Sequence, residues 1–216
     1  MSVAGNDPLF KSPFTPAYWK CAARELKNSK MLMLAALFIA LDIIVSSFFV
    51  PIGDGNLRVY FSFFVKALGA MIYGPVIGLI TGFAGDILGF ILHPSGPFFP
   101  GYTLTAMCSA LTYGLFFYRA KIGPVRVVLC KLTVNLAINV AMGSFWSACL
   151  FGKGYYYYLA KSVVKNLLLL PLEAVLLFAF FAAMIPILER MNVIPKGQLR
   201  LRNKKQPPAK DSVPQM

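Results

Sequence analysis

Apolar residues are gathered into six runs along the chain, separated by short segments rich in proline, glycine or charge. About 20 apolar residues cross a bilayer as a helix, so residues 31–190 have room for about six crossings with short connections. The runs cover residues 31–51, 59–73, 76–92, 102–117, 125–150 and 163–188. The pattern predicts an all-α, polytopic membrane protein that forms a bundle of six transmembrane helices.

The segments between the runs predict how the helices are connected. The first run ends at Pro51, before turn-forming residues at 52–56, and Gly74-Pro75 predicts a tight hairpin between the second and third helices. Residues 93–101 contain three prolines and two glycines, which excludes a regular helix and predicts an ordered loop or lid.

Composition and charge agree with a membrane protein. The chain is 58 % hydrophobic and 13 % charged, about half the charged share of a soluble domain. Its 21 Lys and Arg against 8 Asp and Glu give a net charge of +13, concentrated at the two ends. We expect a basic cytoplasmic segment at 1–30, a membrane domain at 31–190 and a basic, disordered cytoplasmic tail at 191–216. Topology anchoring and contact with anionic lipid explain this charge better than nucleic-acid binding does.

Cytoplasmic termini place three connections on the outer side, at residues 53–58, 93–101 and 151–161. These are the longest and most irregular connections, and they carry basic and aromatic residues, so we predict an outward-facing ligand pocket beneath them. The sequence has no HExxH, GxSxG or P-loop motif and no CxxC spacing. We therefore expect no enzyme activity, no cofactor and no metal site.

Several polar residues interrupt the apolar runs, and each costs a few kcal/mol if it faces lipid at mid-bilayer. They are Asp42, Lys66, Asp86, Lys131, Asn135, Asn139, Lys165, Asn166 and Glu173. We expect them to face protein, water or each other. For Asp86, one turn from the outer end of the third helix, two interpretations stay open: ligand contact, or a structural bond to Lys66, Lys131 or the backbone.

For two further pairs of residues, two interpretations also stay open. Asn135 and Asn139 are four residues apart on one helix face, where they either join helices or bind a ligand. Lys165 and Asn166 begin the sixth helix on its outer side, where the ammonium either meets an anionic substrate or extends to the interface.

Aromatic residues crowd the outer side, and an interfacial belt explains most of them. Phe98, Phe99, Tyr102 and Trp146 are the stronger candidates for stacking on a ligand, because two lie on the proline-rich loop and two at helix ends beside it. The single histidine, His93, is more consistent with a hydrogen bond in the loop than with metal or proton chemistry.

Small residues mark two faces where helices approach closely. The third run carries one glycine per turn on a single face, which predicts a neighbouring helix there: Gly78, Gly82, Gly85 and Gly89. The first run carries Ala36 and Ala40, an AxxxA pair that allows another helix to pack, from this chain or a partner.

Taken in order, the motifs resemble the substrate-binding (S) components of energy-coupling factor vitamin transporters, folate branch, over about residues 31–186. The segments that carry the resemblance are LRVYFSF at 57–63, MIYGP at 71–75, GFAGDILG at 82–89, PSGPFFPGYTL at 94–104, KNL at 165–167 and PLE at 171–173. The resemblance implies a prokaryotic cell-membrane protein that captures a vitamin, while a coupling membrane subunit and two cytoplasmic ATPases supply the energy. It also implies that Ala36 and Ala40 dock the coupling subunit.

Folate, the ligand that this branch implies, has ring systems for stacking and a glutamate tail for cations. We expect Arg58, Lys161 and Lys165, with the neighbouring Asn166, at the carboxylates. The pterin edge would meet Asp86, Asn135 and Asn139. The chain has Ser47 and Ser162 where arginine is usual in the folate pattern, so Arg58 and Lys161 would have to substitute.

Three alternatives remain at the level of sequence. The first is the same transporter class with another vitamin or precursor, such as pantothenate. The second is a polytopic enzyme acting on lipid through Asp42, Asp86 and His93, which we disfavour because Asp42 and His93 are expected to be too far apart for one site. The third is a structural or assembly membrane protein without a ligand.

Overall fold

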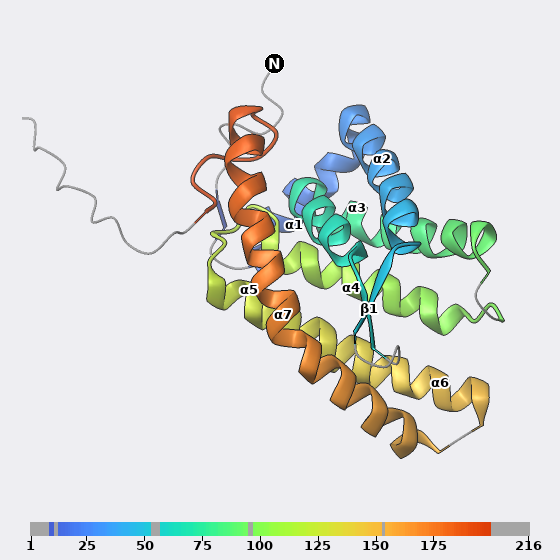
Figure 1. Cartoon of the computed structure of the whole chain (residues 1–216). Coiled ribbons are helices and arrows are strands. Elements are labelled where there is room, and N and C mark those ends of the chain that lie inside the picture. Colours follow the sequence, from blue (N-terminus) through green and yellow to red (C-terminus); the bar gives the residue numbers. More distant parts are fainter. Residues whose placement is uncertain (1–8, 11–12, 53–56, 95–96, 153, 200–216) are drawn as a thin grey trace, which may run out of the picture.

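The computed structural model describes residues 9–10, 13–52, 57–94, 97–152 and 154–199, and in these ranges the chain is almost entirely helical (Figure 1). The elements in chain order are α1 (Pro16–Arg24), the 3₁₀ turn η1 (Glu25–Lys27), α2 (Ser29–Ser46), β1 (Phe49–Ile52), β2 (Leu57–Tyr60), α3 (Ser62–Leu92), α4 (Pro100–Phe117), α5 (Pro124–Leu132), the π-helix η2 (Thr133–Met142), α6 (Gly143–Phe151) and α7 (Tyr155–Arg190). The helical class predicted from the sequence is confirmed, with one short hairpin added.

The hairpin β1–β2 corrects the prediction that residues 49–51 and 59–60 belong to helices. The two strands pair antiparallel, with Phe49 opposite Tyr60 and Ile52 opposite Leu57. Both strands are rich in β-branched and aromatic residues, which favour strands, and the sequence between them contains Asp-Gly, which is typical of hairpin turns. The signal was therefore present in the sequence.

Four helical rods are long and apolar enough to cross a membrane: α2, α3, the α5–η2–α6 rod over Pro124–Leu150, and α7. The α3 rod consists of two helical halves that run in different directions (Figure 1). The bend lies at Gly74, whose φ of 85° and ψ of −179° suit only glycine, and Pro75 follows it. The two halves of α3, together with α4, bring the number of helical passes in the described chain to the predicted six.

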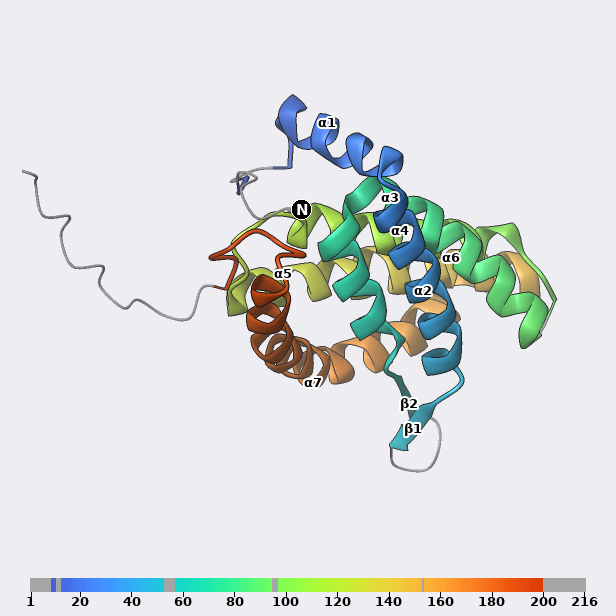
Figure 2. The same cartoon turned by 90° about the horizontal axis from the view of Figure 1, so that it is seen from above.

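The last connection is much shorter than predicted. Residues 151–161 were expected to form an irregular outer segment, but α7 already begins at Tyr155. The α6 helix ends at a left-handed glycine, Gly152, with φ of 72°. No helix breaker follows Gly154 until Pro171, so the tyrosine-rich segment extends α7. The α5–η2–α6 rod packs along this long helix (Figures 1 and 2).

The glycine face of α3 serves two purposes, of which the sequence predicted one. A Cβ at Gly78 would lie 3.3 Å from the Ala110 carbonyl oxygen of α4, and one at Gly82 would lie 3.0 Å from that of Ala106. These glycines let α4 pack antiparallel to α3. The prediction of a helix neighbour is wrong for Gly85 and Gly89, because nothing lies within 4 Å of a Cβ at either position.

The N-terminal helix α1 is fastened to the end of α4. The buried Tyr18 hydroxyl donates to the Gly114 carbonyl oxygen at 2.9 Å, and burial raises the pKa of Tyr18, which keeps this donor protonated. Beside it, Arg119 Nη2 lies 2.9 Å from Glu25 Oε1, and both side chains are buried. The Phe10 amide donates to the Arg119 carbonyl oxygen at 2.9 Å.

The chain after α7 returns to the same α4–α5 connection. The Ile122 amide donates to the Gln198 carbonyl oxygen, and the Glu189 carboxylate accepts from the Gly197 and Gln198 amides at 2.9 and 3.0 Å. Segments near both ends of the described chain therefore lie on one face of the bundle. Most of the tail that the sequence assigned to 191–216 lies outside the described residues.

The glycine face gives a paired prediction. Gly82→Ala should lower the free energy of unfolding by about 1–3 kcal/mol, because the new methyl group meets α4 backbone that cannot retreat freely. Gly89→Ala should be neutral or raise it by up to about 1 kcal/mol, because the site is open and alanine favours helix. Unfolding of both variants in the same detergent measures the difference, and equal stabilities would contradict the proposed packing.

Candidate ligand-binding site

A cavity of about 790 Å³ lies between the end of α2, both halves of α3, the start of α4 and the proline-rich loop. The glycines that face no helix, Gly85 and Gly89, line it, so their missing side chains leave room for the cavity. Three residues that the sequence proposed for ring stacking also line it, namely Phe98, Phe99 and Tyr102.

Aromatic rings form the wall at the loop end of this larger cavity. Phe98 lies 5.2 Å from Phe90, and Phe99 lies 6.1 Å from Tyr102, between ring centroids. Trp146 does not line the cavity itself, but its ring lies 5.7 Å from that of Phe99 and supports it from behind. Such pairs hold rings in fixed orientations, as a stacking surface requires.

Two carboxylates face the larger cavity from different helices. Asp86 Oδ2 accepts a 2.7 Å hydrogen bond from the Thr103 hydroxyl of α4, and the structure gives it no bond to Lys66 or Lys131. Asp42 on α2 lies 3.6 Å from the Lys66 ammonium on α3. The larger cavity therefore combines rings with a net negative lining.

A second cavity of about 330 Å³ lies between the first half of α3, α4, the α5–η2 rod and α7. Three of the predicted site residues line it, Asn139, Lys165 and Asn166. Tyr60 and Lys66 line both cavities, so the two spaces adjoin at these side chains. Lys131, Lys165 and Lys66 against the single carboxylate of Glu173 give the smaller cavity a net positive lining.

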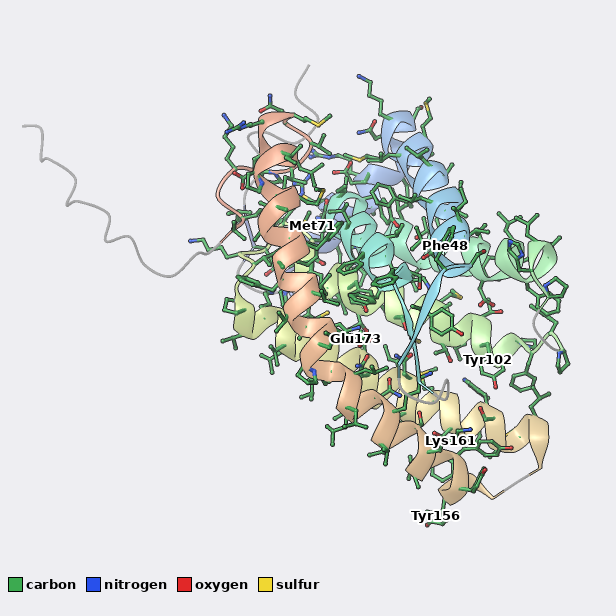
Figure 3. All side chains as sticks on the ribbon, in the orientation of Figure 1. Phe48, Met71, Tyr102, Tyr156, Lys161 and Glu173 are labelled. Carbon is green, nitrogen blue, oxygen red and sulfur yellow. The ribbon has the colours of Figure 1, made fainter. Side chains whose placement is uncertain are left out.

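A buried polar network forms one wall of the smaller cavity. Glu173 lies about halfway along α7 (Figure 3). Its Oε2 atom lies 2.9 Å from the Lys131 ammonium and accepts a 2.9 Å hydrogen bond from Asn135 Nδ2, so α7 is joined to the α5–η2–α6 rod. The Lys131 ammonium also lies 4.2 Å from the centre of the Phe63 ring. Asn135 is only 1 % exposed, so its interhelical role is evident, whereas Asn139 faces the cavity.

The two serines that depart from the folate pattern also lie at these cavities. Ser47 lines the larger one, and its hydroxyl donates to the Ile43 carbonyl oxygen at 3.2 Å. Ser162 lines the smaller one and bonds to Asn166 and Asn139. Both departures from the folate pattern therefore lie at the candidate site.

One sequence expectation about distance needs correction. Asp42 and His93 were expected to be too far apart for one site, yet both line the larger cavity, because Asp42 is only one turn from the end of α2. His93 is exposed, and its side chain makes no hydrogen bond within the described part of the chain. Lys66 and Asp42 are recognisable in the sequence as charges within apolar runs, but the sequence does not show that they pair.

One of the two remaining predicted cations is described, and it is not brought to either cavity. Lys161 is exposed on α7 and lines neither space. The side chain of Arg58, on β2, lies outside the part of the chain whose side chains are described. No group of three potential metal ligands occurs among the described residues.

A bundle of apolar helices around adjoining ring-lined and charged cavities defines a membrane-embedded binding protein. The chain belongs to the family described as "ECF transporter, substrate-specific component", whose model matches residues 30–185. It is therefore a membrane protein of a bacterial transporter family and not a member of an enzyme family.

Similar proteins include folate transporters from two bacteria and a protein of known crystal structure. The chain is 31 % identical to the folate transporter FolT of Clostridium novyi over 171 residues, which is 79 % of this chain and 98 % of that protein. It is 29 % identical over 152 residues to the folate transporter FolT of Leuconostoc mesenteroides, covering 68 % of this chain and 81 % of that one. A crystal structure of FolT bound with folic acid superposes with a TM-score of 0.62 at 26 % identity, covering 70 % of this chain and 92 % of the other.

The Lys131–Glu173 pair should behave as one unit. Breaking a buried pair costs about 3–5 kcal/mol because it leaves an unmatched charge, so Lys131→Met and Glu173→Leu should each destabilise the protein by about that amount. The double variant should cost clearly less than the sum, since no charge remains unpaired. Unfolding in detergent tests this, and strictly additive losses would show that the two side chains do not depend on each other.

Proposed function

We propose that the chain captures folate on the outer side of the membrane as the substrate-binding subunit of an ECF importer. The names of its relatives and the folic acid in the similar crystal structure support this choice of ligand. The observation that carries the proposal is the contrast between two adjoining cavities: one is ring-lined and negative, and the other is polar and positive. Folate has the same polarity along its length, with heterocycle and benzoyl rings at one end and two carboxylates at the other.

The ring systems would lie in the larger cavity. Phe98, Phe99 and Tyr102 offer faces and edges for stacking, with Trp146 behind Phe99. The pterin edge carries amino and ring N–H donors, which a carboxylate accepts well. Asp86 is suited to this role because Thr103 uses Oδ2 and leaves acceptor capacity on the carboxylate.

The glutamate tail would lie in the smaller cavity. Lys165 supplies a cation, and the side-chain amides of Asn139 and Asn166 supply donors beside it. The Lys131 charge is already matched by Glu173 at 2.9 Å, whereas Lys66 has a more distant partner, Asp42 at 3.6 Å. Lys165 and Lys66 are therefore the cations available to the ligand. Charge-assisted hydrogen bonds to the two carboxylates would then fix the orientation of folate.

The orientation in the membrane follows from the ends of the chain. Segments near both ends contact the α4–α5 connection, and exposed basic residues occur on this face, among them Lys20, Lys27 and Lys121. The positive-inside rule supports a cytoplasmic location for this face. The hairpin and the proline-rich loop would then open the larger cavity to the outside.

Energy for transport would come from other subunits, a coupling membrane protein and two cytoplasmic ATPases, because this sequence has no P-loop. Ala36 and Ala40 would dock the coupling protein. Both alanines are exposed on α2, so their face of the helix is open to close packing by a partner.

Folate binding can be measured on the purified chain through Trp146. Trp19→Phe leaves Trp146 as the only tryptophan, next to a ring of the larger cavity. Folate should quench its fluorescence saturably, and pantothenate should not, because pantothenate has no ring system to occupy the aromatic wall. Calorimetry on the unmodified chain provides an independent affinity, and tight pantothenate binding without folate binding would contradict the proposed ligand.

Docking can be separated from binding by enlarging the alanines. Ala36→Leu with Ala40→Leu should abolish folate uptake by cells that produce the whole transporter, because leucine prevents close helix approach while remaining compatible with lipid. Folate binding by the purified variant should remain within about twofold of the original value.

A matched control exists on α7, where Ala179 and Ala183 form a second exposed AxxxA pair. Leucine at both of these positions should leave uptake intact. If the α7 variant loses uptake and the α2 variant keeps it, the docking face is on α7 and the assignment to Ala36 and Ala40 is wrong.

A further inference from the structure

Lys66 occupies an exceptional place in the described structure. It lies one turn into α3, the helix that follows the hairpin, and it is the charged residue that lines both cavities in the described part of the chain. A ligand that extends from the ring-lined cavity into the positive one would therefore lie beside Lys66 and Tyr60. Lys66 is therefore well placed to contact the part of a ligand where the rings end and the tail begins.

The bond between Lys66 and Asp42 is loose compared with the other lysine pair. Lys66 Nζ lies 3.6 Å from Asp42 Oδ2, whereas Lys131 Nζ lies 2.9 Å from Glu173 Oε2. The Lys66 side chain is 34 % exposed and that of Lys131 is 3 % exposed. An ammonium has three donors, so Lys66 keeps hydrogen-bonding capacity that Lys131 has already committed.

The Asp42 carboxylate also keeps hydrogen-bonding capacity that no described residue uses. Its Oδ1 atom is buried and has no hydrogen-bond partner in the described part of the chain. The carboxylate therefore serves chiefly to match the Lys66 charge, which would otherwise stand alone in an apolar span. A ligand carboxylate that reached Lys66 would compete with Asp42 for the ammonium and would be repelled by the Asp42 charge.

We infer that Lys66 binds a carboxylate of the folate tail at the junction of the two cavities, and that Asp42 competes for Lys66 and thereby limits this contact. The inference rests on the proposed function and adds a specificity-determining residue to it. Lys66 would make the site prefer ligands with an anionic tail, and Asp42 would set how strong this preference is.

The test combines two ligands with two variants of the full chain. The ligands are folate and the folate analogue in which both tail carboxylates are carboxamides, which has the same rings but no tail charge. Lys66→Met should weaken folate binding about tenfold or more, as loss of a hydrogen bond to a charged group does, and should change binding of the diamide by less than about twofold.

Asp42→Asn should act in the opposite direction. Removing the competing charge should tighten folate binding by about twofold to tenfold and leave the diamide unchanged. If the pair served only to hold α2 against α3, both variants would instead weaken both ligands to a similar extent. Lys27→Met changes an exposed lysine on η1 that lines neither cavity; it is the matched control and should change neither affinity.

Each result separates this inference from the proposed function. If the unmodified chain binds folate and the diamide equally well, folate binding stands and the role of Lys66 is wrong, whatever the variants do. If Asp42→Asn folds but weakens folate as Lys66→Met does, competition by Asp42 is wrong. If a single variant does not fold, the double variant, which has no unpaired charge, should bind both ligands with similar affinity, and retained preference for folate would overturn the inference. Absence of folate binding to the unmodified chain would overturn the proposed function, and this inference with it.

Discussion

A charge that enters an apolar helix bundle must be matched, and in this protein the matching groups come from different helices. Asp42 and Lys66 connect α2 to α3, and Lys131 and Glu173 connect α5 to α7. An isolated charge at mid-bilayer costs several kcal/mol, so each pair constrains how two helices lie beside one another. The same pairs line the cavities, so the requirement that holds the helices in place also distributes charge around the candidate site.

The space for a ligand arises from the bend of α3 and from the glycines that follow it. Gly74 bends α3, so its second half leaves α2 and runs beside α4 (Figure 1). Gly82 permits close contact with α4, while Gly85, one turn further, leaves the larger cavity open. The glycine face of α3 therefore packs against α4 in its first part and lines the larger cavity in its second part. The proline-rich loop covers the end of this cavity that remains open.

The apolar runs and the breaks at Pro51, Gly74-Pro75 and residues 93–101 were sufficient to predict the helices and their order. The hairpin and the early start of α7 were missed because hydropathy does not distinguish an apolar strand or a tyrosine-rich helical turn from the neighbouring run. The sequence also identified Asp86 and Lys165 as candidate site residues, but it could not predict which charges pair. Pairing depends on how the helices pack in three dimensions, which brings Lys131 and Glu173, far apart in sequence, to a distance of 2.9 Å.

The central claim is that folate lies across both cavities, with its rings near Phe98 and Phe99 and its tail toward Lys165. A crystal or cryo-electron microscopy structure of the purified chain with folate tests this most directly. The heterocycle should lie between α3 and the proline-rich loop, the benzoyl group beside Tyr60, one carboxylate at Lys66 and the other deeper in the smaller cavity. A folate molecule bound in the reverse orientation, or bound outside both cavities, would contradict this claim.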